Sequence, residues 1–167
     1  MSEGSLRTPR LLLRPSREAD AEQVFAFLGD PETMRFTDRM TSLEQCREHL
    51  AAHRRQAEHS GFGAWTIALA DDGAIIGWGG LYVDPFDRRW GAEVGYFFHH
   101  SAWGQGYATE VTQAALDQAA RLGLEQVLAF AHPDNTASQR VLQKAGFEML
   151  RFVDDMNRNL YRWGSAV

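Results

Sequence analysis

A change in the spacing of the apolar residues around Gly104 and Gly106 places the strongest constraint on how this chain can fold. Residues before the two glycines read as a strand, whereas apolar residues recur every three or four positions over 108–122, as in a helix. A short apolar run at 127–130 then has the character of a strand buried on both faces. The pattern predicts a strand–helix–strand unit with parallel strands and a right-handed crossover.

Shorter patterns on either side of this unit complete the layout. Ser16 can cap a first helix, and Thr41 with Glu44 three residues later fits a capping box at the start of a second. Gly146 has the position of the left-handed residue that ends a last helix. We expect an α/β (α+β) fold with a mixed sheet of about seven strands, at 10–15, 65–69, 75–78, 92–98, 127–130, 148–153 and 159–163, and about four helices, at 17–28, 41–60, 107–122 and 136–145.

Composition limits the classes of protein that need to be considered. A chain of 167 residues with 44% hydrophobic content is long enough for one well-buried core, so we expect one domain over residues 1–167. The formal charge is −5 and no Lys/Arg cluster can follow a phosphate backbone, which argues against a nucleic-acid partner. No apolar stretch approaches the roughly 20 residues that cross a bilayer, which argues against a membrane partner.

The cysteine count and the first residues bear on the cell compartment. Cys46 is the only cysteine and cannot form an internal disulfide. The start of the chain, residues 1–4, has neither the basic region nor the apolar run of a secretory signal. We therefore expect a cytoplasmic protein.

The turn between the expected strand and helix, which we call the glycine turn (residues 101–106), can bind phosphate. Unpaired amides at a helix N-terminus attract anions, and two glycines followed by Ala108 would let a pyrophosphate approach the backbone. A turn that uses glycine only to change direction is the alternative. The segment lacks the Gly-Lys-Ser/Thr of a P-loop, and Thr109 stands where the dinucleotide motif needs a third glycine.

A second group of polar residues lies at the start of the last expected helix. Asn135 and Ser138 are three positions apart, so both can face the same end of the sheet as the glycine turn. Capping is the alternative role, with Asn135 as the N-cap or with Thr136 and Gln139 as a capping box. The two roles are compatible.

Together these segments resemble the Gcn5-related N-acetyltransferase (GNAT) superfamily. The resemblance rests on three motifs in a fixed order: Trp103-Gly104-Gln105-Gly106-Tyr107-Ala108-Thr109-Glu110, Asn135-x-x-Ser138 and Lys144-x-Gly146-Phe147. Its branch of ribosomal-protein N-terminal acetyltransferases (RimJ/RimL-like) is similar also at Leu11-Leu12-Leu13-Arg14 and Glu93-Val94-Gly95-Tyr96-Phe97. The match covers about residues 6–163, and each motif is common, but their order and spacing are specific.

The resemblance implies a single GNAT domain whose sheet is splayed where it holds acetyl-coenzyme A (acetyl-CoA). In the family signature, Gln/Arg-x-x-Gly-x-Gly/Ala, Gly106 and Ala108 match the small positions. Trp103 stands in place of the Gln or Arg, which leaves backbone amides to hold the pyrophosphate, while the strand at 96–98 would bond the pantetheine arm. The residues implied in cofactor binding are Tyr96, Phe97, Phe98, Gly104, Gln105, Gly106, Tyr107, Ala108, Thr109 and Asn135.

The implied reaction moves an acetyl group from acetyl-CoA to a primary amine by direct attack in a ternary complex. Ser138 matches the serine that, in related enzymes, is placed to give a proton to the departing CoA thiolate. An amine nucleophile also needs a base, and Glu93 is our candidate, with His99 and His100 behind it. A solvated strand residue is the alternative for Glu93. A protein N-terminus and a small-molecule amine both fit as the acceptor.

Other hypotheses stay open at this point. A module that binds acyl-CoA as a sensor or scaffold without turnover is the alternative function, because folds outlive their chemistry. Asp38 could meet a cationic substrate or lie in a plain solvated loop. Exposed edge strands near the C-terminus would allow a homodimer.

A metal site is not expected. His49, His53 and His59 are spread along one helix that looks exposed, without the carboxylate and cysteine pattern of a metal site. Cys46 on the same helix has the character of a small core residue.

Overall fold

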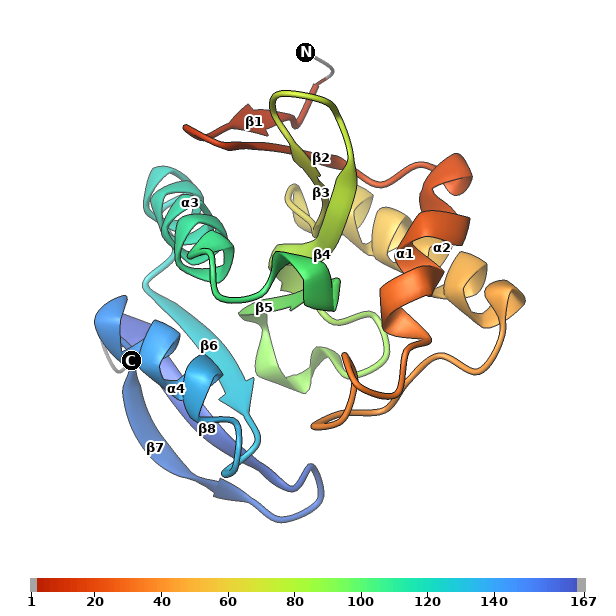
Figure 1. Cartoon of the computed structure of the whole chain (residues 1–167). Coiled ribbons are helices and arrows are strands. Elements are labelled where there is room, and N and C mark those ends of the chain that lie inside the picture. Colours follow the sequence, from red (N-terminus) through yellow and green to blue (C-terminus); the bar gives the residue numbers. More distant parts are fainter. Residues whose placement is uncertain (1–2, 165–167) are drawn as a thin grey trace.

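The computed structural model describes residues 3–164, which form one eight-stranded mixed sheet with helices on both faces (Figure 1). The ends of the expected domain, residues 1–2 and 165–167, lie outside the described residues. Neighbouring strands follow the order β1-β2-β3-β4-β5-β6-β8-β7. The strands are β1 (Leu6–Arg7), β2 (Leu11–Pro15), β3 (Trp65–Leu69), β4 (Ile75–Val83), β5 (Ala92–Phe98), β6 (Gln126–Ala131), β7 (Glu148–Val153) and β8 (Arg158–Gly164).

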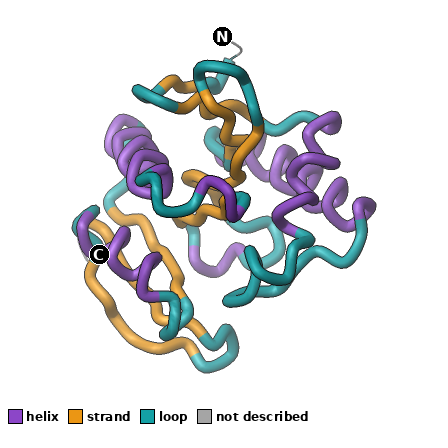
Figure 2. The backbone as a smooth tube through the Cα atoms, in the orientation of Figure 1, coloured by secondary structure: helices purple, strands orange, loops and turns teal. Residues whose placement is uncertain are grey.

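Four α-helices cover the sheet in two pairs, which lie apart with strands between them (Figure 2). The helices α1 (Ala21–Leu28) and α2 (Leu43–Ser60) pack with Trp78 and Tyr82 of β4 in one apolar cluster. The main core lies on the other face, under α3 (Tyr107–Arg121) and α4 (Thr136–Lys144). Three 3-10 turns complete the described elements: η1 (Glu18–Asp20), η2 (Arg88–Trp90) and η3 (His100–Ala102).

The sheet has one strand more than the apolar pattern predicts. The additional strand, β1, has two residues and pairs antiparallel with β2, with Leu6 opposite Leu13. Two residues carry no readable alternation, so the pattern could not reveal this strand. The seven expected strands are present, and β5 and β6 run parallel on either side of α3, as predicted.

The strand β4 is longer than expected because it continues through two glycines. Gly79 and Gly80 have φ angles of +147° and +126°. A Cβ at Gly79 would lie 2.2 Å from the carbonyl oxygen of Gly95, and one at Gly80 would lie 2.5 Å from the Trp65 ring. The glycines therefore allow close packing inside a strand, where the sequence suggests an end.

The helix ends differ from the predictions in two places. Ser42, not Thr41, is the N-cap of α2, and its side chain accepts from the backbone N–H of Gln45. Ser16 caps no helix, since its hydroxyl accepts a hydrogen bond from Thr66 on β3. Gly146, with a φ of +96°, follows α4 in the predicted left-handed conformation.

The sheet opens between β5 and β6, in a gap that we call the wedge. Only Glu93 with Leu128 and Val94 with Ala129 are paired across it, whereas β5 stays paired with β4 as far as Phe98. From Gly95 onward, the edge of β5 that faces β6 therefore has no backbone partner on β6. The predicted splay of the sheet is confirmed.

Candidate active site

The glycine turn presents free backbone amides at the start of α3. Gly104 and Gly106 are both left-handed, with φ angles of +73° and +83°, a conformation that favours glycine. A Cβ on Gly104 would meet nothing within 4 Å, so the space beside the backbone is open. Gly106 is the N-cap of α3 and offers no side chain to the first N–H groups of the helix. This concave, donor-rich backbone fits a pyrophosphate.

Two side chains of the glycine turn donate hydrogen bonds to nearby backbone carbonyls. The indole Nε1 of Trp103 donates to the carbonyl of Phe98 at 2.9 Å, and the Gln105 amide donates to the carbonyl of Ser101 at 3.1 Å. Trp103 therefore fixes the turn to the end of β5, which explains how tryptophan serves at the position where the family signature has Gln or Arg.

A residue that the sequence did not single out, Arg10, anchors the turn from the N-terminal hairpin. Its Nη1 donates to the carbonyl oxygen of Gln105 at 2.7 Å, and its guanidinium lies 4.4 Å from the centre of the Tyr107 ring. Its Nε pairs with Glu110, which also accepts from Thr8 Oγ1 and from the Arg10 backbone. The apolar period places Glu110 outward on α3, and no local signal connects it to a hairpin so distant in the chain.

The predicted pantetheine strand borders the wedge. Tyr96, Phe97 and Phe98 follow the last residue of β5 that pairs with β6. Phe98 and Tyr96 pack in the main core, whereas Phe97 lies on the opposite face and stacks with Trp78 at 6.3 Å. Apart from the Phe98 carbonyl, which accepts from Trp103, their backbone edge toward β6 has no partner on β6 within the described residues and can bond a ligand that enters the wedge.

Asn135 and Ser138 come together with Tyr96. Asn135 is the N-cap of α4, and its Oδ1 accepts from the backbone N–H of Ser138 at 3.1 Å, so the predicted cap is confirmed. The Ser138 Oγ lies 3.0 Å from the Oη of Tyr96. Burial raises the pKa of Tyr96 to about 12, an increase that the hydrogen bond to Ser138 only partly offsets. The capping-box alternative does not form, since the Gln139 amide donates to the carbonyls of His132 and Pro133.

Glu93 is a buried carboxyl group, not a solvated one. Its exposed fraction is 8%, and no hydrogen bond to its side chain occurs among residues 3–164. It sits beside Tyr82 on β4 and Leu128 on β6. Burial, together with the negative charge of Asp84 and Asp87, raises its pKa to about 8. This environment would favour a bound cation.

Ser138, the expected proton donor, and Glu93, the expected base, lie on opposite faces of the sheet. Side chains alternate along a strand, so Glu93 shares the face of Phe97, with α1 and α2, while Tyr96 and Ser138 lie on the α3 and α4 side. Such an arrangement suits two substrates that meet through the wedge from opposite sides. His99 and His100 do not join Glu93; they follow the end of β5, stacked on each other at 4.3 Å.

Two histidines of α2 are more buried than the sequence indicates. His53 is buried and His49 half-buried, both against the ring of Trp78 at 4.7 Å. Burial lowers the pKa of His49 to about 4 and that of His53 to about 3, with His49 contributing to the latter. Within the described part of the chain, Asp30, Glu32 and His100 have ligand atoms within 4.8 Å of one another, but Asp30 already accepts two hydrogen bonds from Thr33. The expected absence of a metal stays a prediction.

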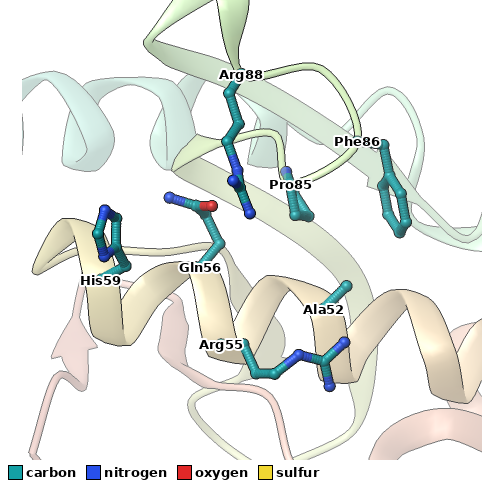
Figure 3. A pocket seen from close by; sticks show the side chains of 7 residues that line it. All are labelled: Ala52, Arg55, Gln56, His59, Pro85, Phe86 and Arg88. Carbon is teal, nitrogen blue, oxygen red and sulfur yellow. The ribbon is translucent and has the colours of Figure 1, made fainter.

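An open pocket of about 450 Å³ lies between α2 and the loop after β4. Figure 3 shows Arg88 extending from that loop toward Gln56 of α2. None of the predicted site residues lines this pocket. The lining residues are Ala52, Arg55, Gln56, His59, Pro85, Phe86 and Arg88.

Comparisons with known proteins agree with this geometry. Residues 10–148 match the family described as "Acetyltransferase (GNAT) domain". An uncharacterized N-acetyltransferase, YoaA of Bacillus subtilis, is 32% identical over 86% of this chain and 82% of its own. An acetyltransferase structure from Agrobacterium tumefaciens has a TM-score of 0.86 at 26% identity, covering 99% of this chain and 96% of that one. RimL, a ribosomal L7/L12 alpha-N-protein acetyltransferase solved with coenzyme A, shares the fold, with a TM-score of 0.74 at 21% identity over 93% of this chain and 94% of its own.

The splayed mixed sheet and the family match together define an acyl-CoA-dependent transferase. The chain belongs to the GNAT acetyltransferase family. No helix in the described range 3–164 combines the length and the apolar character needed to span a membrane.

Proposed function

We propose that this enzyme acetylates a primary amine, either a protein N-terminus or a small-molecule amine, by direct attack of the amine in a ternary complex. The observation that carries the proposal is the buried carboxyl group of Glu93, which lies where the wedge begins and receives no hydrogen bond from any residue in the range 3–164. A carboxyl group left without a donor in such a place suits a substrate that brings one.

Glu93 is the proposed base. An ammonium group entering its pocket supplies the missing donor, and Glu93 takes one proton from the nitrogen. A pKa of about 8 lies close to the working pH, where a base combines a useful ionised fraction with a real affinity for the proton. Asp84 and Asp87 add negative potential that attracts a cationic amine.

The opposite face would hold acetyl-CoA, which supplies the acetyl group as an activated thioester. The amides of Gly104, Gln105, Gly106, Tyr107, Ala108 and Thr109 would bind its pyrophosphate. The edge of Tyr96, Phe97 and Phe98 that faces the wedge would bond its pantetheine arm. Asn135, at the start of α4, would contact the same arm. Ser138 holds a proton at Oγ for the sulfur that departs.

The acceptor class follows from charge more than from shape. Asp38 is not the residue that meets the amine in this proposal, because its charge acts on Arg158 at the start of β8. The acidic residues at the Glu93 pocket support a cationic amine of either kind. A mass-shift screen of cell-extract peptides and metabolites with labelled acetyl-CoA would identify the acceptor.

Thiol release with a panel of amines and peptides tests the proposed reaction. We expect turnover that falls at least tenfold in Glu93→Gln, while Glu148→Gln, which changes an exposed carboxyl group on β7, keeps it. Calorimetric titration with acetyl-CoA tests donor binding separately. Absence of heat at tens of micromolar protein would refute the donor site, and full activity of Glu93→Gln would refute the base.

Two further features support an assembly and a location for the enzyme. The strand β7 is an open sheet edge with exposed Met149, Leu150 and Phe152, which supports a homodimer paired along that edge. Light scattering should then give twice the chain mass, and the chain mass itself in Leu150→Lys. Cys46, the only cysteine, is buried and free, which is compatible with the cytoplasmic location we propose.

A further inference from the structure

The hydroxyl groups of Tyr96 and Ser138 meet across the wedge. Their oxygen atoms are 3.0 Å apart. Tyr96 belongs to β5, beyond the last residue that pairs with β6, and Ser138 belongs to the first turn of α4, which follows β6. The hydrogen bond therefore links the two sides of the opening that the proposed function assigns to the thioester.

Either hydroxyl can donate this bond, and the phenol of Tyr96, which is the more acidic of the two, is the better donor. Tyr96 packs against the main core, and within residues 3–164 Ser138 is the only hydrogen-bond partner of its hydroxyl. Burial keeps its pKa near 12, so the phenol retains its proton at every pH at which the enzyme works. A phenol that donates to Ser138 Oγ leaves the Ser138 proton free, whereas the reverse bond would occupy that proton.

Ser138 is held from two sides. Its backbone N–H is fixed by the Asn135 cap, at 3.1 Å from Oδ1. A serine side chain can still adopt three staggered rotamers about χ1, and the bond to Tyr96 selects one of them. The direction of the Ser138 proton is thus set by a side chain from another strand.

Resting on the proposed function, we propose that Tyr96 is a positioning residue that acts through Ser138. It donates a hydrogen bond to Ser138 Oγ, turns the Ser138 proton toward the sulfur and stabilises the charge that develops on Oγ. In this step the new C–N bond has formed, the C–S bond breaks, and its electron pair leaves on sulfur, which takes the Ser138 proton. The acylated nitrogen gives its second proton to water, water reprotonates Ser138, and Glu93 returns to solvent the first proton that it took from the amine.

Steady-state kinetics separate this role from a packing role. Tyr96→Phe removes the hydroxyl and keeps the ring, so kcat should fall about tenfold or more, while KM for acetyl-CoA and Kd for CoA change less than about twofold. In Ser138→Ala, kcat should fall by a similar factor. In the double variant kcat should fall no further, because the two hydroxyls act as one unit. Tyr161→Phe is the matched control, since Tyr161 is buried in the same core and lies outside the proposed site.

A second readout needs no turnover. CoA is bound to each variant and the pKa of its thiol is measured from the ultraviolet absorbance of the thiolate. A hydrogen bond to the charged form lowers a pKa, so the bound thiol should have a pKa about one unit lower in the wild type than in Tyr96→Phe or Ser138→Ala. Tyr161→Phe should match the wild type.

The outcomes distinguish this role from the proposed function. An active wild type whose Tyr96→Phe variant keeps both kcat and the thiol pKa overturns the role of Tyr96 and leaves the proposed function standing. A wild type that releases no thiol with any amine overturns the proposed function. In that case the pKa of the bound CoA thiol alone tests whether Tyr96 and Ser138 stabilise the thiolate.

Discussion

Arg10 and Glu110 are a hundred residues apart in the chain and form an ion pair, with 2.8 Å between Arg10 Nε and Glu110 Oε1. Because Arg10 also holds the carbonyl of Gln105, the pair connects the N-terminal hairpin to the backbone of the glycine turn. The turn is therefore preorganised by a segment far from it in sequence.

Arg10→Met should weaken acetyl-CoA binding. The turn loses its anchor, and the Glu110 carboxylate is left without its charged partner near the phosphate site. We expect Kd to rise about tenfold in calorimetric titration. Arg7→Met removes an exposed arginine from the same hairpin and should leave Kd unchanged. Equal affinities of the Arg10 and Arg7 variants would show that the ion pair does not shape the turn.

Gly104→Ala should separate backbone strain from loss of the phosphate site. Gly104 and Gly123 have φ angles of +73° and +72°, and a Cβ at either position meets nothing within 4 Å. Alanine at each should cost about 1 kcal/mol of unfolding free energy in urea titrations, from the left-handed backbone alone. Only Gly104→Ala should also lose affinity for acetyl-CoA. Equal losses of affinity in both variants would contradict the phosphate role of the turn.

The raised pKa of Glu93 predicts how stability depends on pH. Between about pH 4.5 and 8 the folded protein keeps a proton that the unfolded chain releases, so stability falls as pH rises through this window. Glu93→Gln cannot ionise and should be more stable than the wild type at pH 9, on the order of 3 kcal/mol, with a much smaller difference at pH 4. Urea unfolding at the two pH values measures this. A variant no more stable than the wild type at pH 9 would mean that burial does not raise the pKa of Glu93.

The same titration should appear in the kinetics. A base must be deprotonated, so kcat/KM should rise with pH and level off above about 8, the pKa of Glu93 in the free enzyme. A profile that levels off near pH 5 would indicate another base.

His53 predicts a loss of stability in acid. Its pKa is lowered from 6.5 to about 3, so the unfolded chain binds the extra proton between these values and stability falls as pH drops through them. His53→Leu cannot titrate and should unfold at a lower pH than the wild type, as followed by circular dichroism. His59→Leu changes an exposed histidine on the same helix and should keep the wild-type midpoint.

Local patterns predicted the elements that carry the proposed acetyl-CoA site. The change of period at Gly106, the Asn135 cap and the parallel pairing of β5 with β6 follow from short-range rules of propensity and topology. The additional strand, β1, was not predicted, because a two-residue strand has no period. The extension of β4 through Gly79 was not predicted either, because a glycine in the sequence suggests the end of a strand.

Contacts between side chains that are far apart in the chain could not be predicted from the sequence. Nothing in the chain around Arg10 indicates Glu110, and nothing around Tyr96 indicates Ser138. The burial of Glu93 and His53 likewise depends on how two helices close on one face of the sheet. Residue type could nominate Glu93 as a base, but only the packing around it raises its pKa.

The narrow seam between β5 and β6 has a mechanical consequence. Four residues join the two halves of the sheet in parallel pairing, and Glu93 is one of them. In the proposed reaction, charge appears and disappears at this residue once in every turnover. Proton transfer from the amine would therefore change the charge inside the short seam that joins the two halves of the sheet, so the reaction and the stability of this seam depend on the same residue.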